Sequence, residues 1–369
     1  MVRVYSGAST RMSVGRFLQQ AAAGGAAGVS ADLMVLPHED GGGGIQCIDI
    51  SDPTNMTVLG TTGSVAAMTK PFQLKLDITN NKAFVVCEDD SVAVIDVSNT
   101  SSPSVTGALA QEDSMKYCDI DPSRDLVFGS DFKNPGGIRV YDVSNASSPS
   151  LDGSSTSAAY NNMFGIASHR SRDICFAVTS NDQLIAFSVA SSSSPAQDGS
   201  VLTDGTNLDG AKAIKLDEAN NIAFIAINNG MTTVNIASTT SMSVLDSVTD
   251  GTGNGDCRDI AIDLEAGLAF VTSVTGDSLM CFDISDTSNL SHISTLSDAT
   301  NLDRARGVSY DPVAKVAYVS AWTANKLTAV DCSNTSSMSV LGSVTTGNAP
   351  GRGAINIGPR EATNGEETS

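Results

Sequence analysis

Short apolar runs, each closed by a polar turn, recur along most of the chain. The runs "FQLKLDI", "KAFVVCE", "SVAVIDVS" and "SVTGALA" follow one another between residues 72 and 110, separated by turns rich in Asn, Asp, Ser and Pro. Short runs that end at such turns are typical of β-strands, whereas a helix needs apolar residues three and four positions apart over a longer stretch. The pattern therefore predicts an all-β protein made of antiparallel hairpins.

The unit of four runs repeats along the chain. Its third run ends at an Asp or an equivalent residue, and these positions are Asp49, Asp96, Asp142, Ser188, Asn235, Asp283 and Asp331, at steps of 46 to 48 residues. A near-constant period of this length with four strands in each unit is the signature of a β-propeller blade. We therefore expect seven blades, each a four-stranded antiparallel sheet.

The first and last repeats are incomplete in complementary ways. Before Asp49 the chain holds only "DLMVLPHE" and "GIQCIDIS", which match runs two and three. The missing run one appears as "GRGAINIGP" at residues 351–359, which matches "RGVSYDP" at residues 306–312. A C-terminal strand is therefore expected to complete a blade whose other three strands are N-terminal, which removes the open sheet edge. The predicted propeller spans residues 32–358, with a polar tail at 359–369.

Runs three and four resemble the LVIVD repeat of β-propellers, in stretches such as "VIDVSNTSSPSV" and "VYDVSNASSPSL". The stretch "VAYVSAWTANKLTAVDCSN" is also similar to the related YVTN repeat. The resemblance covers about residues 32–358, and it implies the propeller fold. It further implies a protein that binds and is secreted or surface-displayed, although some relatives by fold are lactonases or other hydrolases. It carries no catalytic residue onto this chain, and the repeats at Ser188 and Asn235 depart from it by lacking the Asp.

Composition narrows the classes of partner. The net charge of −20 and the pI of about 4.3 argue against nucleic acid and anionic lipid as ligands, because both would be repelled. No apolar run is long enough to span a membrane. The seven cysteines are scattered without a C-x-x-C pair, which favours buried reduced thiols over a disulfide framework or a zinc site.

Residues 1–31 differ from the rest of the chain. They carry Arg3, Arg11 and Arg16 and contain no acidic residue. Three interpretations stay open: a secretory signal, an organellar transit peptide, or a basic arm that docks on a neighbouring subunit. The expected location is secreted, cell-surface or particle-surface, with an organelle as the alternative.

Few residues suggest catalysis. His38, His169 and His292 fall at different places in their repeats, so they are not expected to converge on a metal or a triad. No recognised nucleophile or phosphate-binding motif occurs. An Asp closes run one in five repeats, and we expect it to accept backbone N–H groups in the following turn; the five are Asp77, Asp121, Asp217, Asp263 and Asp311.

One segment could supply metal ligands. Asp250, Asn254 and Asp256 in "DGTGNGD" are the candidates, and calcium is the ion that such oxygen ligands suit. The segment matches no complete calcium-loop pattern, so a flexible Gly/Asp turn is the alternative. No other cofactor is predicted.

A cluster of cations appears when run one is aligned on its closing residue. The position five residues earlier holds Phe72, Lys116, Phe164, Lys212, Arg258, Arg306 and Gly353. Because run one is innermost and the loop before it opens on the channel, we predict that Lys116, Lys212, Arg258, Arg306 and the adjacent Arg352 ring the channel mouth and bind an anion, such as a carboxylate or an acidic peptide. The alternative is that they pair with acidic loop residues, among them Glu112, Asp209 and Asp256.

These observations favour a non-enzymatic binding or scaffolding propeller that engages a partner protein or glycan through one face and its loops. One alternative is a lactonase-like or other hydrolase with a metal or cationic site at the channel mouth. Another is a structural subunit of a larger particle or complex, anchored by residues 1–31.

Overall fold

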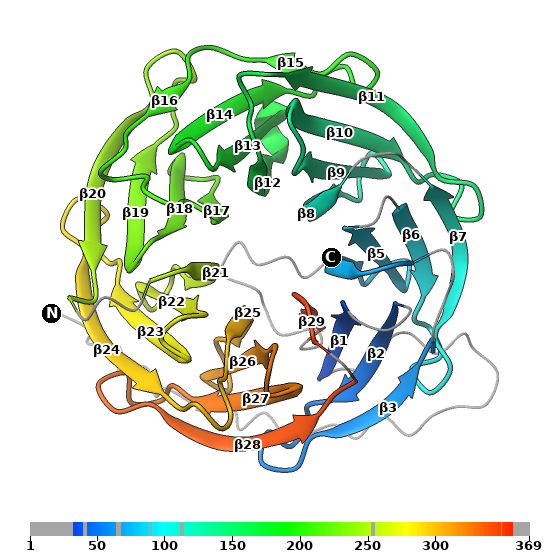
Figure 1. Cartoon of the computed structure of the whole chain (residues 1–369), viewed down its shortest axis with the longest axis vertical. Coiled ribbons are helices and arrows are strands. Elements are labelled where there is room, and N and C mark those ends of the chain that lie inside the picture. The colour runs from blue at the N-terminus through cyan, green and yellow to red at the C-terminus, as the bar shows by residue number, and fades with distance from the viewer. Residues whose placement is uncertain are drawn as a thin grey trace, which may run out of the picture.

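Seven antiparallel sheets stand around a central channel in the computed structural model, which confirms the predicted seven-bladed β-propeller (Figure 1). The structure describes residues 32–39, 43–63, 68–88, 91–110, 114–251, 255–347 and 349–356. The predicted N-terminal segment and the whole of the predicted tail lie outside these residues. The one helix in the described part is a single 3-10 turn, η1 (Arg170–Arg172). None of the described segments is a helix long and apolar enough to cross a membrane.

Each sheet runs outward from the channel to the rim. The innermost strands are β4 (Pro71–Asp77), β8 (Met115–Asp121), β12 (Met163–His169), β17 (Ala213–Asp217), β21 (Cys257–Asp263), β25 (Ala305–Asp311) and β29 (Ala354–Asn356). Next come β1 (Leu33–His38), β5 (Lys82–Cys87), β9 (Leu126–Asp131), β13 (Ile174–Thr179), β18 (Ile222–Ile227), β22 (Leu268–Ser273) and β26 (Val316–Ala321).

The two outer layers contain the repeated Asp and the edge strands. The third strands are β2 (Gly44–Asp49), β6 (Ser91–Asp96), β10 (Gly136–Asp142), β14 (Gln183–Ser188), β19 (Gly230–Asn235), β23 (Ser278–Asp283) and β27 (Lys326–Asp331). The rim strands are β3 (Thr57–Thr61), β7 (Ser104–Ala110), β11 (Ser150–Ser157), β15 (Ala196–Gln197), β16 (Leu202–Thr203), β20 (Ser243–Thr249), β24 (Ser291–Ser297) and β28 (Ser339–Thr345). In one blade the rim strand is split, because β15 and β16 both pair with β14.

The ring closes as predicted, with one C-terminal strand and three N-terminal strands in one blade. β29 pairs antiparallel with β1, and Asn356 lies opposite Leu33. The same segment also joins the next blade, since the Arg352 N–H donates to the Phe72 carbonyl at 2.9 Å and the Leu74 N–H donates to the Arg352 carbonyl at 3.1 Å. The two ends of the propeller are therefore hydrogen-bonded together, and the inner edge of β1 is covered.

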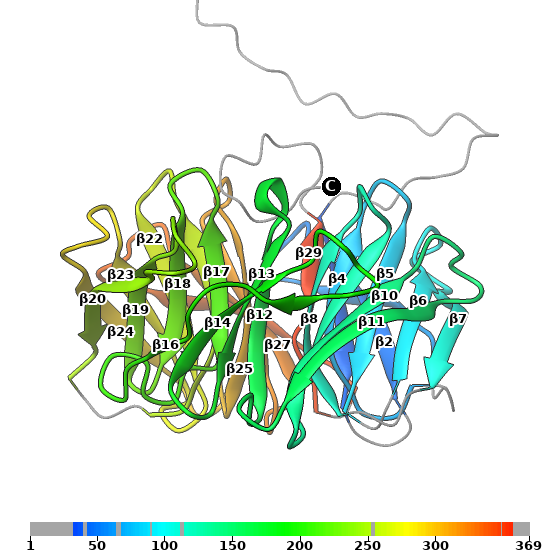
Figure 2. The same cartoon turned by 90° about the horizontal axis from the view of Figure 1, so that it is seen from above.

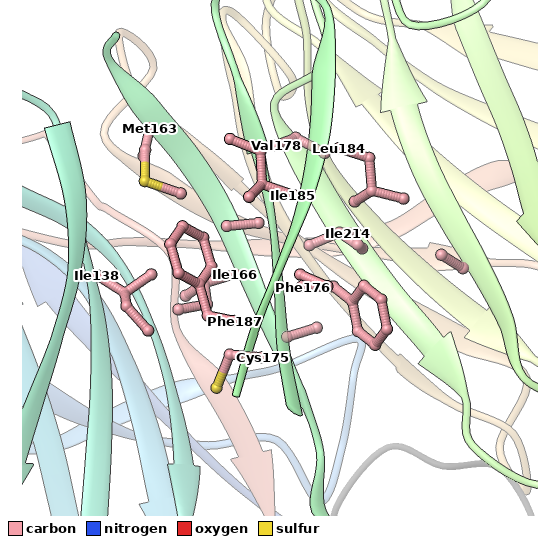
Figure 3. Close-up of a cluster of buried hydrophobic side chains, with 14 of the residues drawn as sticks. Ile138, Met163, Ile166, Cys175, Phe176, Val178, Leu184, Ile185, Phe187 and Ile214 are labelled. Carbon is pink, nitrogen blue, oxygen red and sulfur yellow. The ribbon is translucent and has the colours of Figure 1, made fainter. Parts of the chain in front are cut away.

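The hydrophobic core lies between neighbouring blades. Successive side chains of a strand point to opposite faces, so each sheet packs on both of its neighbours. Figure 3 shows this for β13 and β14, where Phe176 and Phe187 lie between Ile138 of one neighbouring blade and Ile214 of the other. All seven cysteines are buried and none forms a disulfide bond, as predicted. Burial raises the pKa of several of these thiols, as at Cys47, where it is about 12, so they remain protonated.

The repeated Asp of run three shapes the turn that follows it. Asp96 Oδ1 accepts the N–H of Ser98 at 2.8 Å, and the equivalent bond forms at Asp49, Asp142, Asp283 and Asp331. Hydrogen bonds from Ser98 lower the pKa of Asp96, so this carboxylate is held charged. The Asp residues that close run one also act in turns, as when Asp77 accepts the Asn80 N–H at 3.1 Å. Both repeated acids are therefore structural.

We expect Asp96→Ala to lower the free energy of unfolding by about 1 kcal/mol, because the turn loses its acceptor for the Ser98 N–H. Asp96→Asn keeps an acceptor oxygen at the same place and should cost less than half as much. Urea unfolding followed by circular dichroism measures both. Equal losses for the Ala and Asn variants would assign the effect to charge instead of the turn.

Candidate functional site

The channel has two different ends. At one end, here called the bulge end, five innermost strands begin at a β-bulge: β4, β8, β12, β21 and β25. At the other, here called the cavity end, those strands finish and lead into the turns that include η1 and face upward in Figure 2. The sequence predicted a binding site at the bulge end, whereas the structure has a cavity at the cavity end.

The predicted cations do gather at the bulge end. The register shifts around Lys116, Arg258 and Arg306, so each stands as the extra residue of a bulge. A bulge re-aims its side chain away from the regular alternation of the strand, and this explains why one position of the repeat behaves alike in several blades. Lys212 lies just before β17. Its N–H donates to the Ala226 carbonyl at 3.0 Å, and its carbonyl accepts the Gly165 N–H at 3.0 Å.

Carboxylates accompany these cations. Lys116 lies 2.9 Å from Glu88, and Arg258 lies 2.7 Å from Asp256, which Lys212 also contacts. Arg306 pairs with Glu39. The predicted alternative of local pairing thus describes four of the five residues, although Glu39 and Glu88 were not among the acids expected. Burial raises the pKa of Glu39, and Arg306 opposes that rise.

The fifth residue, Arg352, does not lie at the mouth. The sequence alignment placed Gly353 at the bulge position, and this register is wrong. Asn356, not Gly358, lies opposite Leu33, and the next described bridge joins Pro350 to His38, so Gly351 takes the bulge position. Arg352 comes one residue after the bulge position, and its side chain is only 2% exposed.

The structure describes two of the three candidate metal ligands, Asp250 and Asp256. Asp256 is engaged by Lys212 and Arg258, and Asn254 lies outside the described residues. In the described ranges no group of three or more His, Cys, Asp or Glu side chains forms a metal site, and the three histidines belong to different strands, β1, β12 and β24. Calcium binding stays a prediction.

The cavity end holds a cavity of about 380 Å³. The innermost strands of all seven blades line it, so it lies on the axis of the ring. Lys75, Asp119, Lys215 and Asp259 reach it from β4, β8, β17 and β21. Its other charged side chains come from the ends of the inner strands and the turns beyond them: Arg170, Asp217 and Glu218. No aromatic side chain is among its described lining residues.

An ion pair forms one wall of the cavity. Lys75 Nζ lies 3.1 Å from Asp119, and Asp119 Oδ2 accepts both the N–H and the hydroxyl of Ser168 at 2.7 Å. Burial alone would raise the pKa of Asp119, but Lys75 and Ser168 outweigh it and hold the pKa below its ordinary value. Asp119 likewise outweighs burial at Lys75 and raises the pKa of that ammonium. Both groups are therefore charged near neutral pH.

The opposite wall contains a second buried acid. Asp259 Oδ2 accepts the Val308 N–H at 3.1 Å, which links the innermost strands of two neighbouring blades. Asp119 makes the corresponding link to Ser168, so each acid fixes the strand beside it. At the rim of the cavity, Glu218 lies 3.1 Å from His169 Nδ1. The cavity therefore presents fixed charges of both signs.

Sequence reasoning missed this cavity, although a signal was present. Lys75, Asp119 and Lys215 occupy the same register position, two residues before the Asp that closes run one. Three charged residues at one position of a buried strand are unusual, because an unpaired buried charge is costly. That position, aligned across the blades, would have pointed to the cavity end.

Comparisons with known proteins agree with the fold. A periplasmic gluconolactonase from Pseudomonas aeruginosa is 13% identical, with a TM-score of 0.73 over 88% of this chain and 99% of that one. A protein of unknown function from Desulfotomaculum acetoxidans is 14% identical, with a TM-score of 0.72 over the same shares. A proposed 6-phosphogluconolactonase from Bacteroides uniformis is 10% identical, with a TM-score of 0.73 over 86% of this chain and 98% of that one. At such identities the likeness concerns the fold alone.

No curated protein matches the chain. The model of the LVIVD repeat matches four stretches, at residues 40–62, 75–110, 132–157 and 315–346. The repeats at Ser188, Asn235 and Asp283 lie outside these matches. The resemblance to the YVTN repeat stays a prediction. The chain is thus a seven-bladed β-propeller that carries LVIVD repeats.

Proposed function

We propose that this propeller is a binding protein whose ligand is a small, hydroxyl-rich organic acid, free or at the end of a glycan, held in the cavity on the channel axis. The observation that carries the proposal is the cavity of about 380 Å³ with charges of both signs on its walls. A volume of this order suits a monosaccharide-sized molecule. A glycan thus stays among the predicted ligands, and we propose that its terminal sugar acid binds in the channel.

The character of the lining supports this ligand class. Lys75, Lys215 and Arg170 can bind a carboxylate, while Asp119, Asp259 and Glu218 can accept hydrogen bonds from hydroxyl groups. A neutral sugar commonly stacks on an aromatic ring, and the described lining offers none. A purely apolar ligand would shield these charged groups from water without bonding to them. A polyhydroxylated acid satisfies both kinds of group.

Calorimetric titration of the protein with D-gluconate tests this proposal. We expect Lys215→Met to weaken binding about tenfold or more, because it removes a charged donor to the carboxylate. The control is Lys82→Met, which removes the same charge from a lysine that pairs with Asp96 away from the cavity. Wild-type protein that gives no heat with gluconate or other aldonic and uronic acids would contradict the proposal.

Hydrolysis of a sugar lactone is the second candidate. Ser168 Oγ donates to Asp119 at 2.7 Å within the cavity, which places a hydroxyl beside a carboxylate. Two of the solved structures with this fold are named as gluconolactonase or proposed 6-phosphogluconolactonase, which supports the candidate only at the level of the fold. The lowered pKa of Asp119 makes it a weak base, so binding ranks first.

Titration of released acid in a solution of D-glucono-1,5-lactone separates the two candidates. A rate above the spontaneous one that disappears in Ser168→Ala would establish hydrolysis. If the lactone opens only at its spontaneous rate while gluconate binds, the protein is a binding module. The roles of protein scaffold and of particle subunit anchored by residues 1–31 stay predictions, because that segment lies outside the described residues.

A further inference from the structure

Buried hydrogen-bond donors without partners gather in the channel between its two ends. They are Arg352 Nη1, Arg258 Nε, Arg306 Nε and the hydroxyl of Tyr117. We call these four residues the guanidinium cluster. Native proteins seldom leave buried donors unpaired, and each such group points to a water or an ion. The cluster is independent of the proposed function, because none of its residues lines the cavity.

The members of the cluster are in mutual contact. Arg352 Nη2 donates to the Arg258 carbonyl, and Arg352 Nε donates to the Arg306 carbonyl at 3.4 Å. The Arg352 guanidinium carbon lies 4.2 Å from the centre of the Tyr117 ring. Arg352 and Arg306 also lie over one Phe72 ring, at 5.5 and 5.7 Å. Three positive groups and one hydroxyl from four blades thus surround one short section of the channel.

Among the described residues, the charges near the cluster do not balance. Arg258, Arg306, Arg352 and the neighbouring Lys212 are four cations, and the carboxylates they approach within 4 Å are three: Asp256, Glu39 and Asp259. Asp259 is a weak partner, since it lies 3.8 Å from Arg352 and already accepts the Val308 N–H. Lys212 and Arg258 are part-exposed, whereas Arg352 is buried. An excess positive charge beside a buried guanidinium is costly unless an anion neutralises it.

The missing partner must be an acceptor. Guanidinium groups only donate hydrogen bonds. Burial raises the pKa of Tyr117, and the three arginines oppose this without reversing it, so the hydroxyl keeps its proton and can donate as well. A water molecule accepts about two hydrogen bonds and would leave the excess charge in place, whereas an anion accepts all of them and removes it.

We propose that the guanidinium cluster binds one small monovalent anion of halide size between Arg352 and Tyr117. The unpartnered atoms have almost no accessible surface, so the Arg352 and Tyr117 side chains must move slightly to admit an anion, and a small ion needs the least movement. It joins residues from β8, β21 and β25 with the segment before β29, and so it contributes to closing the ring. The site retains three of the predicted residues, Arg258, Arg306 and Arg352, and moves the anion from the mouth into the channel.

Diffraction from crystals grown in sodium bromide, measured at the bromine absorption edge, tests the proposal on the unaltered protein. We expect an anomalous peak within hydrogen-bond distance of Arg352 Nη1 and Tyr117 Oη. Peaks confined to the surface, or density at this place without anomalous signal, would show that water fills the site and would overturn the proposal.

Thermal unfolding at constant ionic strength provides the test in solution. We expect the Tm to rise with chloride or bromide when either replaces isethionate, which is too large to be enclosed. Tyr117→Phe keeps the ring over Arg352 but removes the hydroxyl. We expect this variant to need about ten times more halide for the same rise in Tm. The control is Tyr160→Phe, which removes a hydroxyl bonded to Gln197 at 2.8 Å, outside the cluster. A halide effect that is absent in the wild type, or equal in the two variants, would refute the site.

Discussion

A chain that ends at Ala349 is expected to lose the cooperative unfolding of the ring and to associate. It lacks β29 and Arg352, so β1 loses its inner partner and the bonds from Arg352 to the Phe72, Arg258 and Arg306 carbonyls disappear. We expect the free energy of unfolding to fall by about 4 kcal/mol or more. The exposed edge of β1 can then pair with another chain.

Urea unfolding and light scattering measure this effect. The control is a chain that ends at Asn356, which keeps the whole of β29 and removes only residues outside the described part. It should remain monomeric to the same degree as the full chain and unfold at the same urea concentration. If the chain ending at Ala349 behaved in the same way, the C-terminal strand would not hold the ring closed.

Asp119→Ala is expected to destabilise the protein by about 2–3 kcal/mol, because it leaves the half-buried Lys75 ammonium and the buried Ser168 N–H without their acceptor. Replacing both members of the pair, as in Lys75→Met with Asp119→Leu, should recover most of this loss, since no unpaired charge then remains. Asp119→Asn keeps an acceptor for Ser168, so its loss of stability should lie between those of Asp119→Ala and the double variant. If the double variant were as unstable as Asp119→Ala, packing rather than the ion pair would account for the loss.

The same pair gives a pH dependence with a defined sign. The pKa of Asp119 is lowered in the folded protein, so its contribution is complete above the unfolded carboxylate pKa of about 3.9 and is lost as the pH falls through the lower folded value. We therefore expect the stability of the wild type to decline more steeply in this acidic range than that of Asp119→Asn. Urea unfolding of both proteins between neutral and acidic pH measures the difference.

Most of what the sequence predicts about the fold comes from the repeat. A constant spacing of the residues equivalent to Asp96 reports the number of blades, because each blade must contribute the same strands to a closed ring. It could not fix the register of the last strand. That register depends on main-chain bonds of β29 to β1 and of Arg352 to Phe72, which join the two ends of the propeller. Matching residues 351–359 to "RGVSYDP" by sequence takes no account of β1 or Phe72, the partners that set the register.

The site was partly predictable for the same reason. Lys116, Arg258 and Arg306 share one position of the repeat, and the structure brings them to one end of the channel. Their partners Glu39 and Glu88 follow a different strand, and only the folded ring places them nearby. Arg352 looked like one more surface cation, yet its altered register buries it among aromatic rings and carbonyl oxygens.

The cavity was hidden because its residues come from every blade. Lys75 is the polar member of an alternating strand, a pattern that usually marks a face exposed to solvent. Its contact with Asp119, and that of Asp119 with Ser168, cross from one blade to the next. Such contacts depend on how the blades are packed, and spacing within one repeat does not report that packing.

The most direct test of the account is the structure of the protein soaked with D-gluconate at a saturating concentration. We predict ligand density on the channel axis at the cavity end, with the carboxylate at Lys75 or Lys215 and hydroxyl groups at Asp259 or Glu218. Density only at the bulge end or among the rim loops, or an empty cavity under conditions where calorimetry detects binding, would contradict it.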